Sequence, residues 1–151
     1  GADDGLAIDD FTLRLNAGDV TPPTATAFNP SNGATGVALN GNLVITFSET
    51  IAKGTAGTIA VKRNSDNVTL QSTAVTAAAV TVSGNTATIP FSALAFSTSY
   101  HVTVDAGAFR DAAGNNYAGI TNNTTWSFTT QSAPVPAVSV TPASLSFGYV
   151  A

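Results

Sequence analysis

The chain has 151 residues, only 9% of them charged, and a formal net charge of −4. Its five Lys and Arg residues cannot supply the clustered positive charge that nucleic-acid binding requires, and no apolar run approaches the roughly 20 residues of a membrane-spanning helix. There is no Cys, which excludes disulfides, thiol catalysis and cysteine-based zinc sites. Low charge with many Thr, Val, Ala, Gly and Asn residues is typical of an all-β extracellular module. We expect an extracellular monomer with no nucleic-acid partner and no membrane insertion.

Alternation with a period of two recurs along the chain, whereas apolar residues at helical spacing do not persist over three turns. In chain order, the inward positions of the expected strands are Leu43, Ile45 and Phe47; Ile59 and Val61; Val68 and Leu70; Val80 and Val82; Ala87, Ile89 and Phe91; Tyr100, Val102 and Val104; and Trp126 and Phe128. Turn-forming Asn, Gly, Ser and Asp residues separate these strands. The pattern predicts an all-β fold, an antiparallel Greek-key β-sandwich of the immunoglobulin-like kind with about seven strands.

Two proline-rich stretches mark the expected domain boundaries. Residues 19–23 end in Pro22-Pro23, which cannot lie in a central strand, and residues 131–136 contain two further prolines. The prediction is a sandwich over 19–131, preceded by a strand and linker at 1–18 and followed by a linker and first strands at 132–151.

The sequence between these boundaries resembles a bacterial Ig-like domain of the type found in surface-layer proteins and secreted multidomain proteins. The resemblance rests on several motifs, in the expected order: Thr21-Pro22-Pro23, Asn29 to Val37, Ile45 to Glu49, Ser99 to Val104, Asp111 to Asn115 and Trp126 to Thr130. It covers residues 19–130 and implies a fold more strongly than a function, because such modules serve many hosts.

The flanks resemble pieces of other domains. Residues 4–11 look like the closing strand of a jelly-roll domain, where an acidic residue often binds structural calcium. Residues 137–148 are similar to the first strands of another bacterial Ig-like domain. Both flanks therefore read as fragments of neighbouring domains in a longer polypeptide.

Catalytic candidates are few. The single histidine, His101, lies on an expected strand with Asp105 on the same face, and we expect it to be a solvated surface residue. Trp126 is expected in the core, and Tyr100 fits the tyrosine corner of Ig-like sandwiches. Phe11, Tyr117 and Tyr149 are the aromatic residues expected on the surface, too scattered to form a sugar-binding platform.

The acidic residues gather at one end of the expected sandwich. Four of them, Asp19, Glu49, Asp105 and Asp111, should converge at the N-terminal pole because of where they fall relative to the strands. Calcium binds six to eight oxygen ligands of this kind, so the cluster is either a calcium site or a solvated acidic cap. Arg110 and Lys53 are also expected near this pole, where they could neutralise some of the acids.

Two functions from different classes follow. The first is a non-catalytic spacer or interaction module of a secreted or cell-surface bacterial protein, whose partners are the neighbouring domains of the same polypeptide. The alternative is a carbohydrate-binding accessory module of a secreted enzyme, with a polysaccharide or cell-surface component as partner. It would need exposed aromatic rings or a cleft with polar hydrogen-bonding groups. Catalysis by this chain has the least support.

Overall fold

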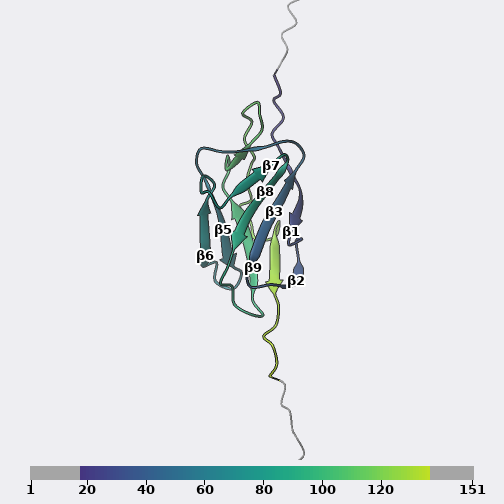
Figure 1. Ribbon diagram of the computed structural model, residues 1–151, viewed down its shortest axis with the longest axis vertical. Helices are drawn as coiled ribbons and strands as arrows, with labels where there is room; N and C mark the ends of the chain where they lie inside the picture. The colour runs from purple at the N-terminus through teal and green to yellow at the C-terminus, as the bar shows by residue number, and fades with distance from the viewer. Residues whose placement is uncertain (1–17, 137–151) are drawn as a thin grey trace, which may run out of the picture.

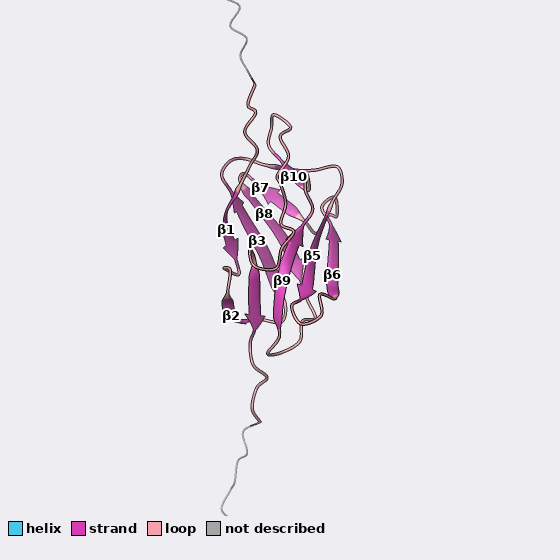
Figure 2. Cartoon of the chain, turned by 180° about the vertical axis from the view of Figure 1, so that it is seen from behind, coloured by secondary structure: helices cyan, strands magenta, loops and turns pink. Residues whose placement is uncertain are grey.

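The computed structural model describes residues 18–136, which form two β-sheets packed face to face (Figures 1 and 2). The predicted flanking strands, at 4–11 and 137–148, lie outside the described residues. No helix capable of crossing a membrane occurs among the residues described.

The first sheet has four antiparallel strands, β1-β3-β8-β7 in spatial order. Their bounds are β1 Ala25–Asn29, β3 Gly41–Phe47, β8 Thr86–Phe91 and β7 Thr81–Ser83. The second sheet has the order β2-β11-β9-β5-β6, with bounds β2 Ala34–Val37, β11 Ser127–Thr130, β9 Ser99–Val104, β5 Thr58–Arg63 and β6 Thr69–Ala74. A separate pair, β4 (Ala52–Lys53) and β10 (Phe109–Arg110), completes the strands described.

The predicted all-β sandwich is confirmed, with two differences of detail. All seven strands expected from the alternation are present, and β1, β2 and the β4–β10 pair are additional, so the described residues contain eleven strands. In addition, β2 pairs with β11 in parallel, through Phe128 opposite Ala34 and Thr130 opposite Val37. This parallel pair arises because both strands run toward the same end of the molecule.

The space between the sheets is filled by the residues that alternation predicted to point inward. Leu43, Ile45, Phe47, Tyr100, Val102, Trp126 and Phe128 are all buried. The indole of Trp126 is fully covered, stacks on Phe28 with ring centroids 4.6 Å apart, and donates a hydrogen bond from Nε1 to the Pro30 carbonyl (2.7 Å).

The tyrosine corner is also confirmed. The Tyr100 hydroxyl accepts a hydrogen bond from the backbone N–H of Ala95 at 2.9 Å. Val68 and Leu70 are exposed instead of inward. They lie just before and within β6, an edge strand paired only on its β5 side among the described residues, and somewhat under half of each residue is exposed.

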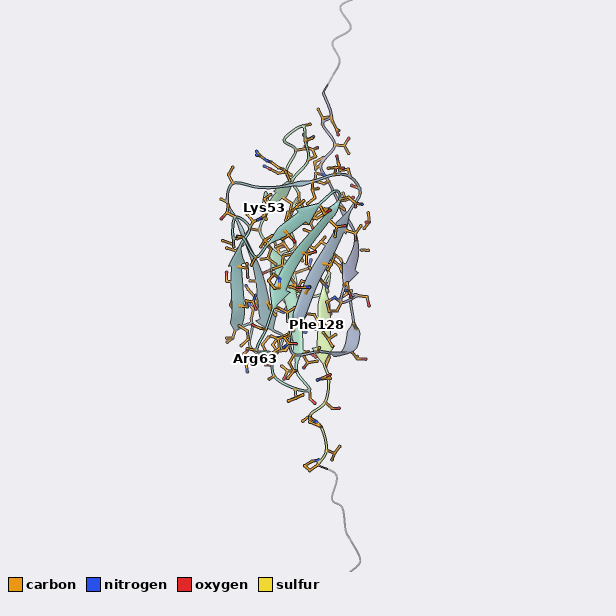
Figure 3. The ribbon with its side chains drawn as sticks, in the orientation of Figure 1. Lys53, Arg63 and Phe128 are labelled. Atoms are coloured by element: carbon orange, nitrogen blue, oxygen red, sulfur yellow. The ribbon has the colours of Figure 1, made fainter. Side chains whose placement is uncertain are left out.

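The described chain enters and leaves the sandwich at opposite ends of its long axis (Figure 1). We call the end that receives the incoming segment (residues 18–24) the N-terminal pole, and the end from which the outgoing segment (residues 131–136) departs the C-terminal pole. Lys53 lies toward the first pole and Arg63 toward the second (Figure 3). The loops at these two poles contain the candidate sites.

Candidate functional site

Three of the four acids predicted to converge do so at the N-terminal pole. Asp19, Glu49 and Asp111 each place one carboxylate oxygen within 4.8 Å of those of the other two. Asp19 comes from the incoming segment, Glu49 follows β3, and Asp111 follows β10. The group therefore joins the incoming segment to two loops of the sandwich.

Asp111 is the buried member of this group and is held by its own loop. The backbone N–H of Asn115 donates to Asp111 Oδ1 (2.8 Å), and Asn115 Nδ2 donates to Asp111 Oδ2 (2.7 Å). Burial alone would raise the pKa of Asp111, but hydrogen bonds from Asn115 and from the backbone of Gly114 and Ala113 outweigh it and lower the pKa. This carboxylate is consequently charged at neutral pH.

The pKa of Glu49 is shifted in the opposite direction. Its pKa is raised, first by partial desolvation and then by the negative charges of Asp19 and Asp111. The only salt bridge within residues 18–136 joins Arg63 and Asp66, so neither Arg110 nor Lys53 forms an ion pair with these acids. Lys53 instead donates from Nζ to the Ala77 carbonyl (2.8 Å). The three carboxylates thus repel one another and would be stabilised by a cation.

Asp105 is not a member of the three-acid group. Its Oδ2 accepts hydrogen bonds from the backbone N–H and the hydroxyl of Thr58, both at 2.9 Å. The carboxylate is therefore used to fasten the start of β5 to the end of β9. Because both residues border paired strands, this contact has a structural role.

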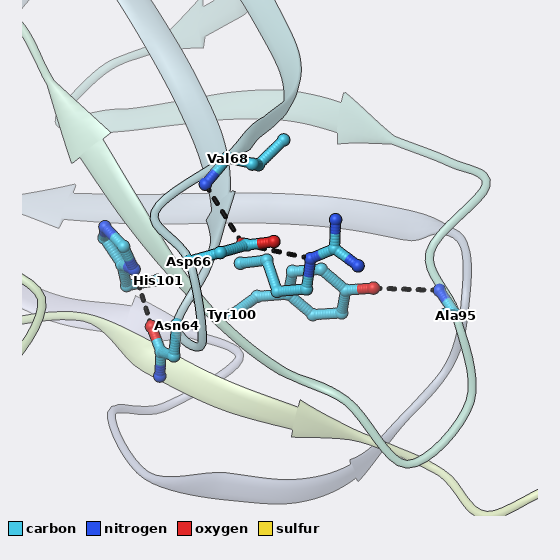
Figure 4. Close-up of polar contacts among 7 residues, drawn as sticks. Asn64, Asp66, Val68, Ala95, Tyr100 and His101 are labelled. Carbon is cyan, nitrogen blue, oxygen red and sulfur yellow. Dashed lines mark hydrogen bonds and ion pairs between the residues drawn. The ribbon is translucent and has the colours of Figure 1, made fainter.

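His101 contradicts the prediction of a solvated surface residue. It is buried, and its Nδ1 lies 2.6 Å from Asn64 Oδ1 (Figure 4). Burial lowers its pKa, and the positive charge of Lys62 lowers it further. Since Asp105 is bonded to Thr58, no His–Asp pair forms between these two residues.

Tyr117 also differs from expectation. It is buried, and its ring meets Phe47 edge-on with centroids 5.1 Å apart. Burial raises the pKa of its hydroxyl. One face of Tyr117, together with Pro22, Pro23 and Phe28, lines an apolar groove of about 500 Å³ between the incoming segment and the sandwich. The other two aromatic residues expected on the surface, Phe11 and Tyr149, lie outside the described residues.

A second, polar cavity lies at the C-terminal pole and was not anticipated from the sequence. It has a volume of about 600 Å³ and is lined by Arg63, Asn64, Ser65, Ser97, Thr98 and Ser99. These residues come from the end of β5 and from the loop that leads into β9. No residue type or spacing predicts this cavity, because the two segments are distant in sequence and serine is a common loop residue.

These features describe a two-sheet Ig-like module with chemically different poles. The family described as a bacterial Ig-like domain matches residues 19–130. The chain belongs to this family, as the motifs between the two proline-rich boundaries suggested. Domains of this family are generally non-catalytic modules of multidomain proteins. A search of the curated proteins finds no match.

Proposed function

We propose that this domain is a spacer of a secreted or cell-surface bacterial protein, holding its neighbouring domains apart and in a defined orientation. The observation that carries the proposal is the position of the incoming and outgoing segments at opposite poles (Figure 1). A module arranged in this way adds its whole length to the polypeptide. Low charge with many Thr, Val, Ala, Gly and Asn residues supports an extracellular location.

The incoming segment is fastened to the sandwich by several hydrogen bonds. Asn115 Nδ2 donates to the Asp19 carbonyl (2.9 Å). The Thr24 N–H donates to Ser48 Oγ (3.1 Å), and the Ser48 N–H donates to the Thr24 carbonyl (2.9 Å). Pro23, between these contacts, is buried, so the direction of the chain is set before β1 begins.

The outgoing segment is fastened at its start. The Gln131 N–H donates to the Val37 carbonyl (2.8 Å), and the Gln131 carbonyl accepts from the Ser97 N–H (3.0 Å). Pro134 and Pro136 follow and restrict the backbone beyond this point. Both ends are therefore suited to transmit orientation between neighbouring domains.

The spacer role is tested by measuring the separation of the two fastened ends. Because the chain has no cysteine, Val20→Cys and Gln131→Cys introduce a single pair of spin labels for pulsed electron resonance. We expect a long and narrow distance distribution. Asn115→Ala, which removes a contact to the incoming segment, should broaden it. A native distribution as broad as that of the chain in urea would overturn the proposal.

Calcium at the three-acid group fits this role as a clamp on the incoming segment. Asp19 belongs to that segment and Glu49 and Asp111 to the sandwich, so one ion bound by all three would cross the joint. Carboxylate oxygens are the ligands that calcium prefers. The pKa of Glu49 is raised first by desolvation and then by the negative charges of Asp19 and Asp111, and the ion would relieve this second contribution.

Thermal melts in chelator, calcium and magnesium at constant ionic strength test the clamp. With a dissociation constant of about 10 µM and about 1 mM calcium, the folded state gains roughly 2.7 kcal/mol, a rise of about 10 °C. Magnesium should do less because it requires a tight octahedron. Asp111→Asn should abolish the rise, whereas Asp105→Asn should leave it. An unchanged midpoint in calcium would show that the acids form only a solvated cap.

Carbohydrate binding is the second candidate function, and the polar cavity at the C-terminal pole favours it. Phe96 is the only aromatic among the exposed large hydrophobic residues of the described chain, so these residues include no stacking platform of several exposed rings. The cavity offers the other requirement, a hollow with polar hydrogen-bonding groups. Retardation of the whole chain in gels containing soluble polysaccharides tests this function, and equal mobility in every gel would contradict it.

A further inference from the structure

The side chains around the polar cavity have hydrogen-bonding groups to spare. Arg63 uses Nε to contact Asp66 Oδ1 (3.2 Å), and within the described chain its two terminal guanidinium nitrogens have no partner. Asn64 uses its oxygen on His101 (2.6 Å), which leaves Nδ2 free among these residues. The hydroxyls of Ser65 and Ser97 likewise form no bond to the described part of the protein.

The fixed positions of these groups make the cavity more than a gap between loops. The Asn64 side chain is held by buried His101, and the Asn64 N–H donates to the Ser99 carbonyl (3.0 Å). The Ser99 hydroxyl pairs with Thr129 Oγ1 (2.8 Å). Tyr100, next along the chain, is fixed to Ala95 by the tyrosine corner (Figure 4). The two walls are therefore tied to each other and to the core.

Ser97, which lines the cavity, has a strained backbone conformation. Its φ angle is +49°, a left-handed conformation that costs a non-glycine residue of this kind roughly 1 to 3 kcal/mol. Strain of this kind is found preferentially where a side chain must be presented to a ligand. A glycine would adopt this conformation without strain but would remove a hydroxyl from a residue that lines the cavity.

The charges at this pole favour an anion. Lys62 and Arg63 end β5, and the single acid beside them among the described residues, Asp66, is already paired with Arg63. The other acids of the described chain, Asp19, Glu49, Asp105 and Asp111, belong to the N-terminal pole. Because these acids lie more than the Debye length of about 8 Å away, their repulsion of an anion bound at the C-terminal pole is largely screened.

We propose that the polar cavity binds a carboxylate-bearing saccharide such as a uronic acid unit of a polysaccharide. The free edge of the Arg63 guanidinium takes the carboxylate through two parallel N–H···O bonds. Ser65, Ser97 and Asn64 Nδ2 meet the sugar hydroxyls, for which hydroxyl and amide groups are matched donors and acceptors. The inference rests on the carbohydrate-binding candidate and is independent of the spacer role.

The test is a titration of the ¹⁵N-labelled 151-residue chain followed by NMR, with sodium glucuronate as the probe. We expect shifts confined to the amides of residues 63–65 and 97–99 and to the Arg63 Nε–H, with a dissociation constant on the order of 1 mM, as ordinary ligand efficiency gives for a molecule of this size. Glucose, acetate and inorganic phosphate, each added separately, should bind at least tenfold more weakly.

Variants separate the contributions of the two walls. Arg63→Gln should weaken glucuronate binding about tenfold or more, the effect of losing a charged hydrogen-bonded partner, while Lys62→Gln removes the same charge one residue away and should change affinity less than threefold. Ser97→Gly should weaken binding about threefold without lowering the melting temperature. Ala93→Gly is its matched control, because Ala93 also has a positive φ (+61°) but does not line the cavity.

The outcomes distinguish the acidic-sugar assignment from carbohydrate binding in general. Glucose binding as tightly as glucuronate, with the same shifts, would overturn the acidic-sugar assignment and leave carbohydrate binding intact. Acetate or phosphate matching glucuronate would show a simple anion site and overturn the saccharide assignment. No shift at about 20 mM of any saccharide, or shifts away from the cavity, would overturn both the inference and the carbohydrate-binding candidate.

Discussion

Replacing Trp126 with Ala should produce one of the largest stability losses available in this domain. The indole is fully buried, stacks on Phe28 and donates to the Pro30 carbonyl. A side chain of this size covers about 200 Å² of apolar surface, which at about 25 cal/mol per Å² corresponds to about 5 kcal/mol. Ala retains a small part of this area, and neighbouring side chains partly collapse into the space, so we expect a loss of about 3 to 5 kcal/mol.

Urea denaturation followed by far-UV circular dichroism measures this loss. Fluorescence is unsuitable for the variant because Trp126 is the only tryptophan in the chain. Trp126→Phe is the informative companion, since it keeps an aromatic ring beside Phe28 and removes the hydrogen bond to Pro30. It should lose about 1 to 3 kcal/mol, the range for an unmade buried hydrogen bond. A loss below about 1 kcal/mol for Trp126→Ala would refute the role of this residue at the centre of the core.

Three further predictions concern pH and close packing. Because the folded pKa of His101 lies below 6.5, the unfolded state binds more protons between that pKa and 6.5. Stability should therefore fall as pH drops through this window, and His101→Gln should reduce the slope in urea titrations at pH 5 to 7. For Glu49 the pKa is raised, so its contribution to stability falls as pH rises, opposite to that of His101. Glu49→Gln removes the charge and should therefore raise the melting temperature at pH 7 in chelator; a lower melting temperature would contradict the mutual repulsion of the three acids. Gly54→Ala should destabilise the domain by about 1 to 3 kcal/mol in the same denaturation assay, because the added Cβ would overlap the Gly107 carbonyl oxygen; wild-type stability would exclude that close approach.

The core could be predicted from the sequence because strands buried on one face alternate apolar and polar residues. Each strand must alternate, so Tyr100 and Val102 could be assigned to the interior from their neighbours alone. The same rule failed for His101, which lies between them on the outer face of the sheet. β9 has β11 and β5 on either side, with Ser127 and Lys62 opposite His101. Side chains of flanking strands and Asn64 therefore cover a position that alternation assigns to solvent.

The acidic group was predicted in part, because strand direction determines which loops share a pole but not where each carboxylate points. Asp19, Glu49 and Asp111 converge as expected, whereas Asp105 turns to the Thr58 N–H and hydroxyl. Nothing in the residue types distinguishes these two outcomes. The polar cavity depends on the contact of two distant loops and on the backbone conformation of Ser97, neither of which has a pattern in the sequence.

The parallel pairing of β2 with β11 has a mechanical consequence. A pull on the incoming and outgoing segments acts along the long axis, since these segments leave from opposite poles. It draws β2 toward one pole and β11 toward the other, so tension slides these strands lengthwise and loads the hydrogen bonds around Ala34–Phe128 and Val37–Thr130 together. β1 is loaded in the same way against β3, its antiparallel neighbour. The domain therefore meets tension in shear, where bonds must break collectively, and not by peeling, where they would open one at a time.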